Sequence, residues 1–276
     1  MTAYNRPTRL DDALALLSLG GRCVLAGGTD YYPGRVGKPL AGDVLDLTAV
    51  RELRGIAERA DHWHIGATTT WNELIEARLP PLFDCLKLAA REIGGQQIQN
   101  AGTLGGNLCN ASPAADGVPP LLALEASIEL ASVTGIRQLP LSQFIIGPRQ
   151  TALAPSEIVT AVLVPKISHE AKSGFLKLGA RKYLVISVAM VAAVIEHEAG
   201  VVRAARVAVG ACSPVAKRLP ALERQLIGKH CHANLAQCVE PQHLAPLAPI
   251  DDLRATGAYR TEAVRILLQR LLAQMA

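Results

Sequence analysis

Glycine pairs divide the first half of this sequence into short segments and limit its fold more than any other feature. The pairs stand at Gly20-Gly21, Gly27-Gly28, Gly94-Gly95 and Gly105-Gly106. Glycine adopts backbone conformations that end helices and strands, so the elements between these pairs are expected to be short. The opening residues accordingly predict a small α/β unit, with a helix over residues 10–19 and strands over residues 22–26 and 43–46.

The remaining apolar patterns predict a mixture of helices and strands. Helices are expected over residues 70–77, capped by a threonine, and over 80–92, 119–124, 215–226 and 261–276. Strands are expected over residues 62–66, 127–132, 157–165, 174–178, 187–197 and 201–210, with a strand or turn over 137–140. Residues 100–116 are expected to form a loop. The polar stretch from Lys166 to Ser173 is expected to separate two domains, 1–167 (a small lobe over about 1–55, a larger lobe over about 56–167) and 168–276.

Composition excludes several classes of protein. Half of the 276 residues are hydrophobic and 19% are charged, so the chain can bury a sizeable core and is not expected to be disordered. Aromatic residues make up 4% and no run of five like charges occurs, which argues against a nucleic-acid binder. The longest apolar stretch, Val185 to Ile195, is about half a membrane span. The first ten residues carry no apolar signal core, so a cytoplasmic protein is expected.

The six cysteines argue against a cluster or disulfide framework in this chain. They are spread over more than half of its length without a Cys-X-X-Cys pair. One weak metal candidate gathers His230, Cys231, His232, Cys238 and His243, but its spacing matches no finger pattern. A surface helix and turn with incidental histidines explains that group better. Any redox chemistry would therefore need another cofactor.

Two glycine-rich turns are the strongest candidates for a binding site. They span Ala26 to Asp30 and Gly102 to Asn107. Backbone N–H groups in tight glycine turns can bind a pyrophosphate without Lys or Arg. Thr29, Thr103 and Asn107 would add side-chain donors, and Asp116 could accept from a sugar or ribityl hydroxyl. Neither turn is a Walker A or Rossmann motif. Each turn alone is as well explained as a structural turn, whereas the two together favour a dinucleotide.

The ordered motifs identify a family. The sequence resembles the FAD-binding medium subunit of the molybdenum hydroxylases, which include xanthine dehydrogenase, carbon monoxide dehydrogenase and hydroxybenzoyl-CoA reductase. The resemblance covers nearly the whole chain. It rests on the two turns and on Tyr4–Pro7, Asp46–Thr48, Leu53–Ile56, Ile65–Thr69, Gln97–Asp116 and Asp252–Arg260.

The resemblance implies an α+β fold and a flavin site. The first domain would have the two-lobed FAD-binding fold of the vanillyl-alcohol-oxidase (PCMH) type, and a smaller α+β domain, an antiparallel sheet with helices, would close over the flavin. The turns would hold the pyrophosphate and ribityl chain, and Asp116 a hydroxyl. Ile93 would lie near the ring system, Leu163 beside the adenine and Lys177 near the flavin. The implied site comprises Leu25, Ala26, Gly27, Gly28, Thr29, Asp30, Tyr31, Ile93, Gly102, Thr103, Gly105, Gly106, Asn107, Asp116, Leu163 and Lys177.

The resemblance also implies electron transfer rather than substrate chemistry on this chain. A large subunit would carry the molybdenum cofactor, a small subunit two [2Fe–2S] clusters, and the complex would be a dimer of heterotrimers. An acidic residue usual in the family before Ile186-Ser187 is replaced by Leu184-Val185. The chain shows no catalytic triad, HExxH motif or paired carboxylates. Two alternatives remain: a self-sufficient FAD oxidoreductase of the same fold, and a cofactor-free scaffold.

Overall fold

The chain forms two compact units, each assembled from three segments of sequence. The computed structural model describes residues 3–37, 42–167, 169–231 and 234–275. The first unit contains Met1–Ala77, Gln96–Ala111 and Ala126–Pro165. The second contains Arg78–Gly95, Ser112–Glu125 and Lys166–Ala276.

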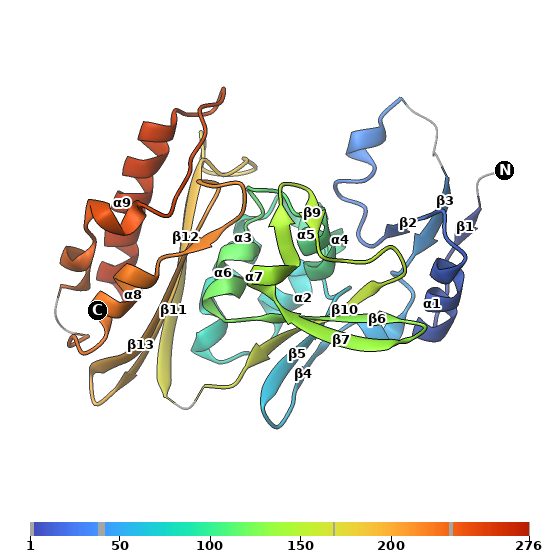
Figure 1. The fold of residues 1–276 in the computed structure, drawn as a ribbon, viewed down its shortest axis with the longest axis horizontal. Helices are drawn as coiled ribbons and strands as arrows, with labels where there is room; N and C mark the ends of the chain where they lie inside the picture. The colour runs from blue at the N-terminus through green and yellow to red at the C-terminus, as the bar shows by residue number, and fades with distance from the viewer. Residues whose placement is uncertain (1–2, 38–41, 168, 232–233, 276) are drawn as a thin grey trace. The chain divides into compact units, whose positions relative to one another are not determined.

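The first unit begins with the expected α/β motif (Figure 1). Its three strands are parallel in the order β1-β3-β2, with α1 beside them. Three residues of α1 at helical spacing, Ala13, Leu14 and Leu17, are buried, and Gly20 ends this segment with a positive φ. The bounds are β1 (Tyr4–Asn5), α1 (Leu10–Ser18), β2 (Arg22–Leu25) and β3 (Asp43–Asp46). The first glycine turn follows directly from β2.

A five-stranded antiparallel sheet forms the rest of this unit's framework. Its order is β4-β5-β10-β6-β7. The bounds are β4 (Ile56–Glu58), β5 (His62–Gly66), β6 (Ser127–Ser132), β7 (Gly135–Pro140) and β10 (Ile158–Pro165). The central strand β10 is buried at seven of its eight residues, because both of its faces are covered. Residues from α1 and β3 share one apolar cluster with Ala131 and Ile158 of this sheet, so the two sheets of the unit pack together.

Short helices carry the second glycine turn. The expected loop over residues 100–116 is wrong, because α4 ends at Ala101 and α5 begins at Leu104. The glycines of α5 lower its helix propensity, and a side-chain cap from Thr103 compensates. The threonine cap predicted for the helix over residues 70–77 is confirmed: Thr70 and Glu73 form a capping box at the start of α2. The bounds are α2 (Trp71–Glu76), α4 (Gln96–Ala101), α5 (Leu104–Asn110), α7 (Leu141–Phe144), β8 (Ile145–Gly147) and β9 (Gln150–Thr151).

The second unit is an antiparallel sheet with helices on both faces. The strand order is β11-β12-β13-β14. Figure 1 shows α8 and α9 on one face of this sheet and α3 and α6 on the other. Eight consecutive residues of β12 are buried as a result. The bounds are α3 (Asp84–Glu92), α6 (Val118–Ala123), β11 (Glu170–Leu178), β12 (Ala189–Glu198), β13 (Val201–Gly210), β14 (Lys217–Arg218), α8 (Pro220–Leu226) and α9 (Gly257–Gln274).

Several predicted boundaries in the second unit are wrong. The helix expected from residue 80 begins at Asp84. Strand β11 begins at Glu170 rather than at residue 174, inside the polar stretch where the domain boundary is expected, because an edge strand needs few apolar residues. The helix expected from residue 215 begins only at Pro220, which fits the first helical position. The helix expected from residue 261 begins at Gly257, capped by Thr256, while Ala276 lies outside the described residues.

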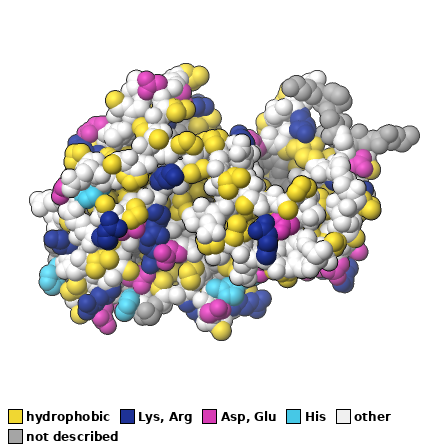
Figure 2. Space-filling model, in the orientation of Figure 1, with side chains coloured by type: hydrophobic (Ala, Val, Ile, Leu, Met, Phe, Trp, Pro, Cys, Tyr) yellow, Lys and Arg dark blue, Asp and Glu magenta, His cyan; other side chains and the backbone are white. Residues whose placement is uncertain are grey.

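Short 3₁₀ turns complete the connections in both units. They are η1 (Pro33–Arg35), η2 (Arg51–Leu53), η3 (Pro81–Phe83), η4 (Leu235–Cys238) and η5 (Pro241–Leu244). Among the described residues, no helix is both long and apolar enough to cross a membrane. On the face drawn in Figure 2, Lys and Arg side chains are interspersed with Asp and Glu rather than gathered in a stripe.

Candidate functional site

The two glycine turns of the first unit lie in direct backbone contact. A Cβ atom on Gly27 would lie 1.8 Å from the carbonyl oxygen of Ala101 and 2.9 Å from the Cα of Gly102. No side chain fits at that distance, so only glycine allows the turns to approach this closely. The sequence therefore requires glycine at residue 27 for packing, whatever ligand the turn binds.

The first turn leaves its backbone donors free. Within the described part of the chain, no N–H group of residues 26–31 donates a hydrogen bond to another protein group. The turn is held instead through a carbonyl, since the N–H of Tyr32 donates to Gly28 O at 3.1 Å. Gly28 has a φ of +69°, a conformation that glycine adopts without strain. A row of such unpaired N–H groups is suited to bind an anion.

The second turn uses its backbone donors within the protein. Its N–H groups donate over 2.8 to 3.1 Å: Leu104 to Thr69 O, Gly105 to Ala67 O, Gly106 to Thr103 Oγ1, and Asn107 to Thr103 O. A Cβ on Gly105 would lie 2.7 Å from the Cβ of Ala67. Glycine is needed here for close packing of α5. The expectation that both turns present free N–H groups therefore holds only for the first turn.

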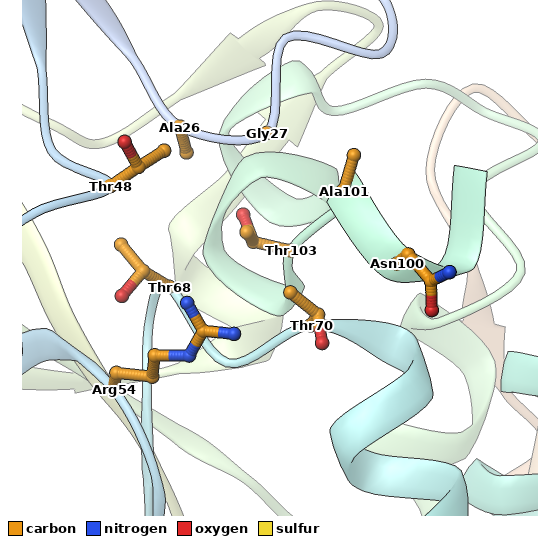
Figure 3. Close-up of a pocket in the computed structure, with 9 residues that line it drawn as sticks. All are labelled: Ala26, Gly27, Thr48, Arg54, Thr68, Thr70, Asn100, Ala101 and Thr103. Carbon is orange, nitrogen blue, oxygen red and sulfur yellow. The ribbon is translucent and has the colours of Figure 1, made fainter. Parts of the chain in front are cut away.

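Both turns contribute to one cavity of about 230 Å³ (Figure 3). It is lined by Ala26, Gly27, Thr48, Arg54, Thr68, Thr70, Asn100, Ala101 and Thr103. The sequence-predicted site includes Ala26, Gly27 and Thr103, and sequence reasoning missed the other six. A signal existed for five of them, because all but Thr70 stand in the segments that carry the family resemblance: Thr48, Arg54, Thr68, Asn100 and Ala101.

Two predicted residues hold buried polar atoms without a partner. Among the described residues, the hydroxyl of Tyr31 and the Oδ1 atom of Asn107 are buried and make no hydrogen bond. Burial raises the pKa of Tyr31, and the guanidinium of Arg35 lies 4.0 Å from the centre of its ring. An unpaired buried polar atom is costly unless a ligand or water satisfies it. A cofactor with hydroxyl groups, such as FAD, fits these two atoms.

Arg149, which belongs to neither turn, forms an ion pair with Asp30 of the first turn. Nη1 of Arg149 contacts Asp30 Oδ2 at 2.8 Å and also contacts the Asn110 side chain. The hydrogen bond from this guanidinium is the main reason that the pKa of Asp30 is lowered. Arg149 has a φ of +58°, which is strained for a residue other than glycine. Asp30 thus links the turn to the end of α5 through Arg149.

The second unit contains three further predicted residues. Asp116 is buried, and it accepts hydrogen bonds from Lys177 Nζ at 2.7 Å and from Ser187 Oγ at 2.5 Å. Burial raises the pKa of Asp116, although the ammonium of Lys177 acts against this shift. Lys177 also donates to Glu92 O, next to Ile93 at the end of α3. The predicted residues of this unit are therefore close together, whereas Leu163 is buried in β10 of the first unit.

No metal site is found among the described residues. No group of three or more His, Cys, Asp or Glu side chains there could hold an ion, and His232 of the weak candidate lies outside those residues. All six cysteines are free thiols.

Family models match both parts of the sequence. Residues 1–167 match the FAD-binding domain in molybdopterin dehydrogenase, and residues 175–275 match the C-terminal domain of the carbon monoxide dehydrogenase flavoprotein. The chain belongs to this flavoprotein family. It is an FAD-binding oxidoreductase subunit of the molybdenum hydroxylase type, and the predicted α+β, two-lobed FAD-binding fold with a C-terminal domain is confirmed.

Relatives of this flavoprotein align over almost their full length. The carbon monoxide dehydrogenase medium chain of Hydrogenophaga pseudoflava is 30% identical, over 98% of this chain and 95% of that protein. The xanthine dehydrogenase FAD-binding subunit of Escherichia coli O157:H7 is 28% identical, over 99% of this chain and 95% of that protein. A solved structure of carbon monoxide dehydrogenase from Hydrogenophaga pseudoflava matches with a TM-score of 0.89 at 30% identity, covering 99% of this chain and 96% of that chain.

Proposed function

We propose that this chain accepts electrons from [2Fe–2S] clusters of a partner subunit and passes them to an external acceptor. The observation that carries this proposal is the first glycine turn, whose free N–H groups lie beside a cavity shared with the second turn. A pyrophosphate accepts hydrogen bonds from such donors. Because the chain belongs to an FAD-binding family, the ligand that carries this pyrophosphate is FAD. We assign residues 1–167 to the FAD-binding domain and residues 168–276 to the C-terminal domain.

The residues of the two units take different roles in this proposal. Residues 25–31 hold the pyrophosphate, with the free N–H groups of residues 26–31 as donors. Thr103 adds its hydroxyl to that group, and Asn107 contacts the ribityl chain. Asp116 has acceptor capacity left after its two internal hydrogen bonds, so it can accept from a further hydroxyl. The full set is Leu25, Ala26, Gly27, Gly28, Thr29, Asp30, Tyr31, Ile93, Gly102, Thr103, Gly105, Gly106, Asn107, Asp116, Leu163 and Lys177.

The chain's own contribution is to bind, orient and shield the cofactor. FAD, when bound, can exchange one or two electrons, which suits a junction between iron–sulfur clusters and a two-electron acceptor. Substrate chemistry belongs to a large molybdenum-cofactor subunit and cluster relay to a small subunit. We propose a dimer of such heterotrimers, working in the cytoplasm. The relatives described as medium chains support a complex with larger and smaller subunits.

The experiment is an absorption spectrum of the purified chain before and after adding FAD, with the bound fraction titrated by quenching of flavin fluorescence. Saturable uptake of FAD with flavin absorption bands is expected. A colourless protein that ignores FAD, even after co-expression with its partner subunits, would support the cofactor-free scaffold. Turnover of a substrate by the flavin-loaded chain alone would support the self-sufficient oxidoreductase.

A further inference from the structure

The cavity beside the glycine turns is lined by one positively charged residue and no negatively charged residue. None of its nine lining residues is acidic, and Arg54 is the one cation among them. Four of the nine are threonines and one is an asparagine. A cavity lined in this way is suited to a ligand that carries negative charge and accepts hydrogen bonds.

The carboxylate of Glu73 orients the guanidinium of Arg54. Its Nε donates to Glu73 Oε1 at 2.7 Å, and Glu73 is itself held by the N–H of Thr70 at 2.8 Å. Burial alone would raise the pKa of Glu73, but the hydrogen bonds from Thr70 and Arg54 outweigh it and lower that pKa. The carboxylate therefore stays charged and fixes the plane of the guanidinium.

The other end of Arg54 is free to bind. Within the described ranges, neither terminal nitrogen of Arg54 donates a hydrogen bond to a protein group. Figure 3 shows these two nitrogens directed into the cavity, toward Thr70 and Thr103. A guanidinium with its two terminal nitrogens unpaired can bind two oxygens of one phosphoryl group.

Two threonine hydroxyls add donors to the same space. Thr48 Oγ1 accepts a hydrogen bond from Arg6 Nε at 3.1 Å, and Thr103 Oγ1 accepts one from the N–H of Gly106 at 3.1 Å. Because each oxygen serves as an acceptor, its own proton remains available for a ligand. The hydroxyl of Thr68 is used, since it donates to Leu53 O at 2.9 Å.

We propose that Arg54, Thr48 and Thr103 form a phosphoryl-binding site, with Glu73 as the positioning residue of Arg54. The phosphoryl group belongs either to the pyrophosphate of FAD or to a separate phosphate-bearing ligand. The first case rests on the proposed function, and the second does not. In both cases Arg54 supplies the positive charge that the neutral N–H groups of the first turn lack.

The test compares three variants of the full chain. Arg54→Met removes the charge, and Arg54→Lys keeps the charge but loses the planar fork. Arg137→Met is the matched control, because Arg137 lies in the same unit, its Nε donates to Glu157 Oε1 at 2.6 Å, and it does not line the cavity. FAD, riboflavin and inorganic pyrophosphate are titrated against each protein, and thermal unfolding is recorded alongside.

We expect Arg54→Met to weaken phosphoryl binding about 10- to 100-fold, Arg54→Lys to weaken it less, and Arg137→Met to leave it unchanged. A loss for FAD without a loss for riboflavin assigns the site to the cofactor's pyrophosphate. A loss for pyrophosphate with unchanged FAD binding assigns it to a separate ligand. Equal binding of all three ligands by wild type and both Arg54 variants would overturn the inference. So would equal losses for FAD and riboflavin.

These outcomes separate the inference from the proposed function. A wild-type chain that binds FAD, together with an Arg54→Met variant that binds both FAD and pyrophosphate equally well, rejects the role of Arg54 and keeps the flavin. A wild-type chain that ignores FAD but loses pyrophosphate binding on Arg54→Met rejects the flavin and keeps the phosphoryl site. If Arg54→Met fails to fold, Arg54→Lys and the salt dependence of pyrophosphate binding give the same comparison, because ion pairing weakens as salt rises.

Discussion

The two glycine turns have similar sequences, but their backbone N–H groups differ in their hydrogen bonding. In the first turn the N–H groups of residues 26–31 are unpaired, whereas in the second those of residues 104–107 are bonded inside the protein. The glycines differ as well. Gly27 lets two stretches of backbone touch, and Gly105 lets a helix approach Ala67. Glycine content alone therefore does not identify an anion site; what matters is whether neighbouring acceptors already use the N–H groups.

A substitution at the contact between the turns is expected to have the largest effect on stability and FAD binding. Gly27→Ala would place a Cβ 1.8 Å from a backbone oxygen, and backbone must then shift. We expect a loss of roughly 3 kcal/mol or more in the free energy of unfolding, together with loss of FAD uptake. Thermal unfolding and flavin titration measure the two effects. Gly34→Ala is the control, since nothing lies within 4 Å of its added Cβ, and an equal effect there would refute the argument.

Neighbouring glycines of α5 sharpen the comparison. Gly105→Ala would bring a Cβ to 2.7 Å from Ala67 Cβ and should destabilise the chain by about 1–3 kcal/mol. The Cβ of Gly106→Ala would lie 2.8 Å from Thr103 Oγ1 and, at an ordinary contact distance, 3.8 Å from Ala26 Cβ. The gain in helix propensity, about 1 kcal/mol, should offset the disturbed cap. Chemical denaturation of both variants checks this order, and a more damaging Gly106→Ala would contradict it.

The cap of α5 gives a smaller effect. Thr103→Ala removes the oxygen that accepts from the N–H of Gly106, at an expected cost of about 1 kcal/mol in the free energy of unfolding. Thr103→Ser keeps the oxygen and should restore most of that stability. Denaturant titrations of the two variants provide the measurement. Equal losses in both would mean that the methyl group, rather than the cap, matters.

The ion pair on the first turn gives the smallest effect. The folded pKa of Asp30 is lowered, chiefly by the hydrogen bond from Arg149, so its contribution is complete above the unfolded pKa and is lost as pH falls through the folded pKa. Both side chains are more than half exposed, which limits the contribution to under about 1 kcal/mol.

Arg149→Gly removes the side chain and also relieves the positive φ at that residue. Unfolding of wild type and Arg149→Gly is compared between pH 7 and pH 3. The stability difference between them should change in the acidic range only. A difference that stays constant through that range would show that Asp30 does not contribute through its charge.

Local patterns in the sequence predicted much of the fold. The Thr70 cap of α2 and the apolar spacing of α1 are short-range signals, and both are confirmed. Helix α5 was missed because its glycines favour a loop locally, while the Thr103 cap and the contact with Ala67 stabilise a helix. Tertiary contacts override propensity in such cases.

The site was harder to predict, because its geometry is made by residues far apart in sequence. The contact between Gly27 and Ala101 joins two segments that no local pattern connects. Arg54 follows an ordinary turn, and its position in the cavity depends on Glu73, which a helix cap holds in place. The turns themselves could be predicted from their glycines, but which of them offers free donors could not.

Amide hydrogen exchange with and without FAD tests the central claim most directly. We expect the N–H groups of residues 26–31 to exchange fast in the free protein and to become protected when FAD binds, whereas those of residues 104–107 are already protected. Protection that appears over residues 104–107 while residues 26–31 stay unchanged would contradict it.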